Sequence, residues 1–213
     1  MPTQIYKNAA GKRLPSVTTI LSRFKESGAL IHWAWNLGKE GIDYRAVRDA
    51  AADAGTLAHA MVEARIRRKP FPLEAEYPPE MWTKASNAFG AFAEWSEQTR
   101  LEPAETEVPN TCECHQVGGT LDTIFVQGKL SLGDWKTSGG VYPEYLIQLA
   151  AYRHLWDVNN PERPIVGGSH LLRFSKLGGD FTHHFWSDLS DAWEAFVHMR
   201  ALYDIMASLK QRT

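Results

Sequence analysis

GGTLDTIFVQGKLSLGDWKTSGG, residues 118 to 140, reads as two apolar strands that carry charged residues. Asp122 lies in the first strand-like run, Asp134 lies near the end of the second, and Lys136 follows two residues later. Because side chains alternate along a strand, Asp134 and Lys136 project from one face while Trp135 points to the other. Asp122 belongs to the neighbouring strand of the predicted hairpin. The stretch therefore predicts two carboxylates and an ammonium group in one site.

Such a group of charges needs a compensating ion. Two carboxylates held together repel each other, so one must take up a proton unless a cation lies between them. Oxygen ligands suit Mg²⁺ or Mn²⁺, and beside such an ion Lys136 could hold an attacking water and neutralise charge on phosphorus. An isolated Asp-x-Lys is more typical of an ion pair at a strand end. The hypothesis therefore depends on the motifs around it.

The rest of the chain alternates between helical and strand-like patterns. Helices are expected in residues 15–24, where Ser16 or Thr18 would be the cap, and at 46–68, 79–98, 143–157 and 188–210. Strands are expected at 105–108, 117–126 and 129–135 as an antiparallel meander, and near 165–175 and 180–187 as a hairpin. Gly55 could divide the second helix. The order predicts one mixed α/β domain over residues 1–213, with a central, mostly antiparallel or mixed β-sheet flanked by α-helices.

Composition restricts the class of protein. A net charge of −2 argues against a large duplex-binding surface, although Arg65, Arg67, Arg68 and Lys69 form a local basic cluster. No apolar run is long enough to span a membrane, and the N-terminal residues lack the pattern of a signal or transit peptide. The chain has only two cysteines, so we expect a reducing, cytoplasmic environment.

Further motifs accompany the central stretch. Ala-Gly-Thr-Leu-Ala-His ends at His59, and Gln148 and Tyr152 follow in the helix after the strands. With Gly-Thr-Leu-Asp and Gly-Asp-Trp-Lys-Thr, these motifs resemble the PD-(D/E)XK nuclease superfamily, in its branch of helicase-associated nucleases and related exonucleases. Pro-Ser-Val-Thr-Thr-Ile-Leu, near the N-terminus, is similar to a segment of phage and mitochondrial single-strand exonucleases. The resemblance covers about residues 14–155 and implies a restriction-endonuclease-like nuclease core, with core motifs at about 55–155 and a helical N-terminal part at 14–99.

The resemblance also implies roles for individual residues. His59, Asp122 and Asp134 would bind the catalytic Mg²⁺ or Mn²⁺ with the backbone carbonyl of Trp135, and Lys136 would be the catalytic lysine. Some members place an extra acidic residue beside the site. Glu107 matches that residue, and Glu105 is the competing candidate.

A second group of residues would support the site or contact DNA. Gln148 and Tyr152 are four residues apart and therefore share one helix face. Thr137, Ser138, Ser16 and Thr18 complete the group. Taken alone, His59 would be an ordinary core or surface histidine, Tyr152 a core aromatic residue, and Gln148 a polar helix residue.

The function implied is that of a metal-dependent deoxyribonuclease. We expect an exonuclease of phage or bacterial DNA recombination or repair that prefers ends with single-stranded character, with unknown recombination or replication partners. Almost the whole chain is used for the nuclease core, which leaves no separate domain for recognising a target sequence. Trp33 and Trp35 could stack on unpaired bases, or simply pack in the core. The alternatives are a structure- or sequence-specific endonuclease and a non-catalytic nucleic-acid-binding module. The presence of Asp122, Asp134 and Lys136 disfavours the second.

Two other motifs suggest metal ligands. Cys112-Glu-Cys114-His115 looks like a zinc or iron–sulfur fragment, and some relatives in this branch hold a four-cysteine cluster. This chain lacks the other cysteines, so we expect no iron–sulfur cluster, and a hairpin loop between the first two strands instead. His183 and His184 are adjacent and would face opposite sides of a strand, which disfavours shared metal ligation.

Overall fold

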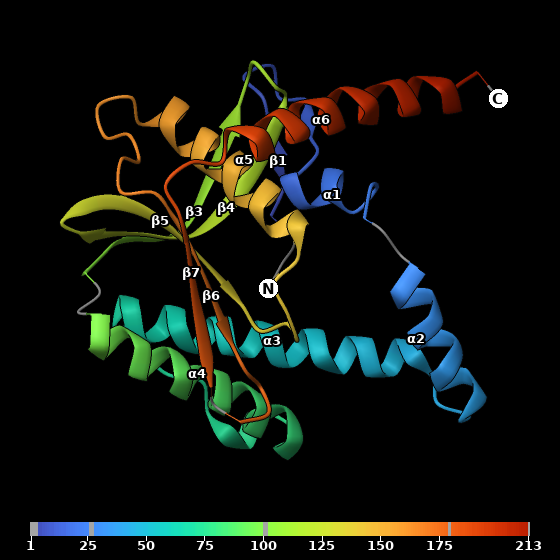
Figure 1. Ribbon diagram of the computed structural model, residues 1–213, viewed down its shortest axis with the longest axis vertical. Helices are drawn as coiled ribbons and strands as arrows, with labels where there is room; N and C mark the ends of the chain where they lie inside the picture. Colours follow the sequence, from blue (N-terminus) through green and yellow to red (C-terminus); the bar gives the residue numbers. More distant parts are fainter. Residues whose placement is uncertain (1–3, 26–27, 100–101, 179, 213) are drawn as a thin grey trace.

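A five-stranded sheet forms the centre of the protein (Figure 1). The computed structural model describes residues 4–25, 28–99, 102–178 and 180–212. The strands are β3 (Glu102–Cys112), β4 (Val117–Gln127), β5 (Lys129–Lys136), β6 (Ser169–Phe174) and β7 (Phe181–Trp186). They lie in chain order across the sheet, and β5 and β6 run parallel while the other neighbours are antiparallel. The predicted mixed sheet is confirmed.

Helices cover both faces of this sheet. On one side lie α3 (Tyr44–Arg67) and α4 (Pro79–Thr99). On the other lie α5 (Pro143–Asn159), α6 (Ser190–Lys210) and the short α1 (Val17–Leu21), as Figure 1 shows. Helix α5 forms the crossover between the parallel strands β5 and β6. Parallel neighbours cannot be joined by a tight turn and need a long connection, which is usually a helix. The architecture is a mixed α/β layer structure.

Each face has its own apolar core. The α3–α4 side is formed by alanines and large rings, among them Phe92, Trp95 and Trp135. The α5–α6 side buries Leu132 from the same strand as Trp135, together with Trp156 and Phe196. Residues 132 and 135 differ in parity, so the alternation along β5 divides them between the two cores. The same alternation turns Asp134 and Lys136 toward α5.

The structure also corrects several sequence-based expectations. Gly55 does not divide its helix, because α3 continues through it from Tyr44 to Arg67. Helix α2 (Gly28–Lys39) was not expected. It buries no residue among those described, unlike the other long helices. Strand β3 is longer than expected, since its two prolines weaken the strand pattern but are tolerated on an edge strand.

Small elements complete the chain. Strands β1 (Tyr6–Lys7) and β2 (Arg13–Leu14) pair with each other, and a 3₁₀ turn, η1, spans Glu74–Glu76. Ser16 caps α1, as predicted, by accepting a hydrogen bond from the Thr19 N–H at 3.0 Å. Among the described residues, none of the helices has the length and apolar character required to cross a membrane.

Candidate active site

Asp134 and Lys136 end β5 on the face that α5 covers. Lys136 Nζ lies 2.5 Å from Asp134 Oδ2 and 5.1 Å from the centre of the Tyr145 ring on α5. The Asp134 side chain is buried, and neither of its carboxylate oxygens has a hydrogen bond of ordinary geometry to a described residue. Trp135, between them, packs in the opposite core. The alternation predicted from the sequence is confirmed. The buried carboxylate of Asp134 is held by its ion pair with Lys136.

Asp134 and Lys136 shift each other's pKa. Burial raises the pKa of Asp134 to about 6, although Lys136 opposes the rise. Burial alone would lower the pKa of Lys136, but Asp134 and then Asp122 raise it above its ordinary value. At neutral pH Lys136 is therefore an ammonium group, and Asp134 is a carboxylate close to taking up a proton.

Asp122, His59 and Glu107 converge beside this pair. Asp122 Oδ2 accepts a hydrogen bond from the Trp135 N–H at 2.8 Å and lies 3.9 Å from His59 Nδ1. One possible ligand atom from each of the three residues lies within 4.8 Å of the other two. Strands β3 and β4 supply the carboxylates and α3 supplies the imidazole. The structure thus brings together three residues that lie 48 and 15 positions apart in the chain.

Glu107 rather than Glu105 joins this group. Glu107 lies opposite Asp122, between the pairs Thr106–Thr123 and Val108–Leu121, and has a positive φ of 50°. Such a backbone conformation is unfavourable for a non-glycine residue and occurs preferentially at functional sites. Burial, followed by the charge of Asp122, raises the pKa of Glu107 to about 7. The Glu105 carboxylate points away to Arg163, 3.1 Å distant.

The donor set fits a divalent cation. Burial, and then the charge of Lys136, lowers the pKa of His59 to about 4, so its imidazole is neutral and able to ligate. Glu107 and Asp122 repel each other, and the charge of Asp122 also acts against that of Asp134, which Lys136 only partly compensates. A cation would relieve both conditions, and imidazole with carboxylates suits Mn²⁺ or Mg²⁺.

The site opens into a hollow that continues along the sheet edge. A space of about 380 Å³ is lined by Gly55, Thr56, His59, Glu107, Thr120 and Asp122. A second space, of about 470 Å³, shares Glu107 with it and is lined by Ile66, Arg67 and residues 103–109 of β3. Part of the predicted basic cluster is neutralised there, because Arg67 and Lys69 both pair with Glu63, at 3.2 and 3.1 Å.

The predicted pair on α5, Gln148 and Tyr152, lies close enough to Asp134 and Asp122 for their charges to act on Tyr152. Gln148 Nε2 donates a hydrogen bond to Tyr152 Oη at 3.0 Å, and both side chains are buried. Burial, followed by the charges of Asp134 and Asp122, raises the pKa of Tyr152 well above its ordinary value, so it stays a phenol. Gly119 makes room for this ring, because a Cβ there would lie 2.7 Å from Tyr152 Cε1.

The other predicted residues are distributed around the site. Thr137 lies against α3, where a Cβ on Gly55 would be 2.8 Å from its Oγ1. Ser138 Oγ donates to the Gly140 carbonyl at 2.7 Å. Ser16 is occupied in capping α1, while Thr18 beside it is exposed. The start of α1 is tied to β4, since the Gly118 N–H donates to the Pro15 carbonyl at 3.1 Å.

Sequence reasoning missed three residues near the site. Tyr145 offers its ring to Lys136, and its place one turn before Gln148 could have indicated this. Thr120 lies two residues before Asp122 on β4, and its Oγ1 is 2.7 Å from Tyr6 Oη. No local signal marks Tyr6, because only the folding of β1 against β4 brings it there.

The comparison with known families decides the identity of this fold. A profile described as the PD-(D/E)XK nuclease superfamily matches residues 6–201. The chain belongs to this superfamily. The predicted resemblance is confirmed, and the protein is a PD-(D/E)XK nuclease by family. Nucleases of this superfamily typically use divalent metals, and His59, Glu107 and Asp122 could hold one here.

Solved structures share less with this PD-(D/E)XK chain. A candidate exonuclease from Eubacterium rectale is 13% identical, with a TM-score of 0.49, and the match covers 70% of this chain and 64% of that one. The chain thus spans less than two thirds of that protein. A protein named SSO0001 is 16% identical, with a TM-score of 0.37 and 74% coverage of each chain. No curated protein matches.

Proposed function

We propose that this protein is a metal-dependent deoxyribonuclease that hydrolyses phosphodiester bonds at DNA ends, with a preference for single-stranded character. The observation that carries the proposal is the convergence of His59, Glu107 and Asp122 beside the Asp134–Lys136 pair. Family membership supplies the nuclease chemistry. A role in phage or bacterial recombination or repair stays a prediction from the sequence.

Four side chains would hold the metal. His59, Asp122 and Asp134 are the ligands implied by the family motifs, and the geometry adds Glu107. The ion would supply a Lewis acid that neutralises charge on the scissile phosphate. Asp122 is oriented for this task by the Trp135 N–H, and Asp134 by the ammonium group of Lys136.

Lys136 would act on the substrate. Its ammonium group is buried on one side by Tyr145, carries its charge at neutral pH, and can donate hydrogen bonds to a water or a phosphate oxygen. Such a donor, held in place before the reaction, stabilises the charge that develops in the transition state. Tyr152 would support the carboxylates from below, since its oxygen already accepts from Gln148 and its proton remains to be donated.

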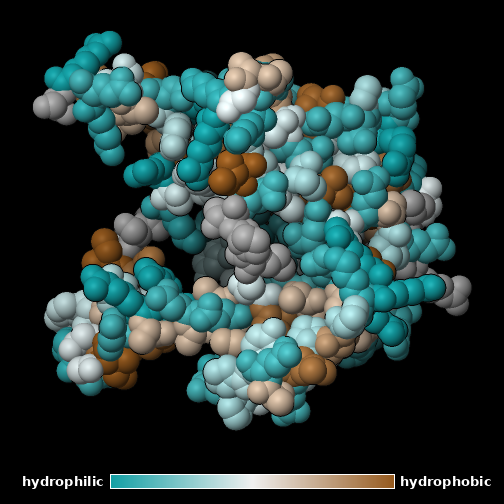
Figure 2. Space-filling view, turned by 180° about the vertical axis from the view of Figure 1, so that it is seen from behind, coloured by the Kyte–Doolittle hydropathy of each residue, from teal (hydrophilic) through white to brown (hydrophobic). Residues whose placement is uncertain are grey.

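Three features support the preference for ends with single-stranded character. Figure 2 shows the molecule hollowed between α2 on one side and α1 and α6 on the other. Trp35 on α2 is 59% exposed, and an exposed ring can stack on an unpaired base. A net charge of −2 suits a short single strand better than a long duplex. The main rival is an endonuclease with the same site.

A comparison of linear and circular substrates tests the proposal. Covalently closed single-stranded DNA and the same molecule linearised are incubated with Mn²⁺, with Mg²⁺ and with excess chelator, and Asp134→Ala serves as the inactive control. We expect metal-dependent degradation of the linear form alone. Equal cleavage of both forms would establish an endonuclease, and full activity in chelator or in Asp134→Ala would refute the metal mechanism.

A further inference from the structure

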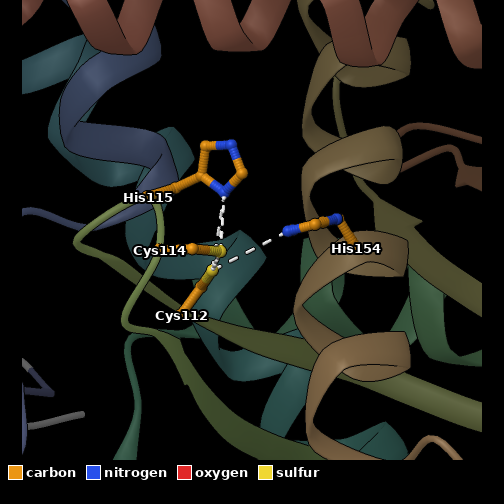
Figure 3. Close-up of side chains that lie close together, drawn as sticks. All are labelled: Cys112, Cys114, His115 and His154. Carbon is orange, nitrogen blue, oxygen red and sulfur yellow. Dashed lines mark hydrogen bonds between the residues drawn. The ribbon is translucent and has the colours of Figure 1, made fainter.

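A second group of metal-ligand side chains lies at the tip of the β3–β4 hairpin, outside the site described above. Cys112 ends β3, Cys114 and His115 lie in the turn, and His154 reaches in from α5 (Figure 3). One ligand atom from each of these four residues lies within 4.8 Å of the others. His154 is two positions beyond Tyr152, and such a spacing points to nearly opposite sides of a helix. This cluster is therefore distinct from the nuclease site.

The distances within the cluster fit ligation of one ion. Cys112 Sγ lies 3.6 Å from His115 Nδ1 and 3.7 Å from His154 Nε2, and Cys114 Sγ lies 3.1 Å from His115 Nδ1. Bond lengths of ~2.3 Å to sulfur and ~2.0 Å to nitrogen give tetrahedral edges of about 3.6 Å between S and N, and about 3.8 Å between the two sulfurs. Cys114 Sγ is too close to two of its partners, at 2.8 Å from Cys112 Sγ and 3.1 Å from His115 Nδ1. It would have to move away by about 0.5–1 Å to reach these edges. Cys114 is the exposed cysteine and lies in a turn, so this movement needs less repacking than a movement of the buried Cys112 would.

The surroundings hold the two imidazoles in place. His154 stacks on Trp193 of α6 with ring centres 4.0 Å apart, and Trp193 meets the His115 ring edge-on at 5.0 Å. Arg200 of α6 donates from Nε to the His115 carbonyl at 2.9 Å and so ties the turn to this helix. Contacts that fix the ring of a ligating histidine also fix the direction of its ligand atom.

We propose that Cys112, Cys114, His115 and His154 bind one zinc ion in a closed structural site that fastens the β3–β4 turn to α5. Two thiols and two imidazoles in tetrahedral reach are the ligand set of structural zinc sites, and four protein ligands leave no open position for catalysis. The soft sulfur ligands exclude Mg²⁺ as the occupant. The sequence motif lacked two further cysteines for a cluster, but the fold supplies His154 from 40 residues beyond Cys114.

Such a site would join the β3–β4 hairpin to α5, and both of these parts carry residues of the nuclease site. Strands β3 and β4 hold Glu107 and Asp122, and α5 holds Gln148 and Tyr152. A metal bond across them would stabilise the folded state, because the unfolded chain does not present these four ligands together. The proposal does not depend on the proposed nuclease activity, so its tests use metal content, absorption and stability.

Metal content and cobalt spectroscopy test the proposal directly. The full chain is purified in reducing buffer, its metals are measured by mass spectrometry, and zinc is then exchanged for Co²⁺. We expect about one zinc ion per chain, and thiolate-to-cobalt charge-transfer absorption with the visible bands of tetrahedral Co²⁺. Asp122→Ala removes a ligand of the nuclease site and should change neither result.

Variants assign the ion to the cluster. Cys114→Ser and His154→Gln should each reduce the zinc content from about one ion per chain to about zero. His198→Gln, an exposed histidine on α6, is the matched control and should keep the ion. Cys114→Ser alters only an exposed side chain, so it is the variant least able to damage the fold. A chelator should lower the Tm of the parent protein but not that of Cys114→Ser.

Several results would overturn the proposal. A zinc-free parent protein that develops no thiolate absorption on titration with Co²⁺ would do so. Iron with the visible absorption of a cluster would mean a different cofactor, and a Cys112–Cys114 disulfide in the reducing buffer would mean a redox pair. Zinc lost from Asp122→Ala but retained by Cys114→Ser would assign the ion to the nuclease site.

Discussion

Two glutamates on β3 show how a single residue position decides the chemistry. Glu105 and Glu107 are both plausible site acids from the sequence, and both would lie on one face of a regular strand. The positive φ of Glu107 departs from the extended backbone of a regular strand, so its side chain need not point the same way as that of Glu105. Glu107 lies beside Asp122 with a pKa raised to about 7, first by burial, whereas Glu105 forms an ion pair with Arg163.

Removal of the charge from each glutamate gives a matched test. Glu107→Gln should weaken Mn²⁺ binding at the nuclease site by at least about 10-fold, because the proposed cation loses a carboxylate ligand. Glu105→Gln should leave Mn²⁺ affinity unchanged. Isothermal titration calorimetry measures both. The opposite order of effects would make Glu105 the site acid.

Lys136 is expected to act on the reaction rather than on metal binding. An ammonium group cannot ligate a cation but can steady a water or a phosphate oxygen. Lys136→Ala should therefore reduce turnover by about 10²- to 10³-fold, with metal affinity largely retained.

Lys129→Ala is the control for Lys136→Ala, because Lys129 lies at the exposed start of the same strand. Turnover is measured on linear single-stranded DNA, and metal affinity by calorimetry. A collapse of metal affinity together with turnover in Lys136→Ala would mean that the lysine is structural.

At the scale of elements, the approach of α3 to β5 places the imidazole. His59 lies one helical turn after Gly55, at the point where α3 contacts Thr137 at the end of β5. The sequence suggested that Gly55 divides the helix, yet its backbone is helical throughout. The glycine is needed for space instead, because any Cβ there would lie 2.8 Å from Thr137 Oγ1.

Two helical glycines allow this interpretation to be tested. Gly55→Ala should cost about 1–3 kcal/mol of unfolding free energy through overpacking, and should lower activity as α3 shifts His59. Gly90→Ala in α4 meets nothing within 4 Å, and should stabilise by about 0.5–1 kcal/mol. Urea unfolding measures both changes.

The pair Gly55→Ala and Thr137→Ala should couple, since removing Oγ1 makes room for the new methyl group. We expect the double variant to recover part of the lost stability. If Gly55→Ala and Gly90→Ala gave the same gain in stability, helix propensity alone would explain both, and the contact with Thr137 would be unimportant.

At the scale of the whole molecule, the hollow beside α2 is the place where we expect a DNA strand to enter. Figure 2 shows it between α2 and the side formed by α1 and α6. Helix α2 exposes Leu30, Ile31 and Trp35, and Lys39 Nζ lies 4.5 Å above the Trp35 ring. Trp33 instead lies edge-on to Tyr44 on α3. A cation beside an exposed ring suits a strand that offers both phosphates and bases.

Trp35→Ala should therefore weaken the binding of single-stranded DNA. The loss of one stacking contact of about 1–3 kcal/mol corresponds to about 5- to 150-fold in Kd. Phe185→Ala, an exposed ring on the opposite edge strand β7, is the matched control. Fluorescence anisotropy with a labelled oligonucleotide measures both. Equal affinities of Trp35→Ala and the parent would exclude α2 from the path.

Local patterns in the sequence were sufficient for much of this protein. Period-two alternation places Asp134 and Lys136 on one face, and a spacing of four places Gln148 and Tyr152 together, because these relations depend only on strand and helix geometry. The order of helices and strands predicted the mixed sheet for the same reason. The motifs also predicted the superfamily that the profile confirms.

The tertiary structure decided what depends on distant contacts. The positive φ of Glu107, the arrival of Tyr6 beside Thr120, and the approach of α3 to Thr137 have no local signal in the sequence. His154 joins Cys112 and Cys114 only because α5 crosses the sheet next to the β3–β4 turn. Periodicity describes neighbours along the chain, whereas a binding site is made by packing between elements, and packing brings together residues that no spacing rule connects.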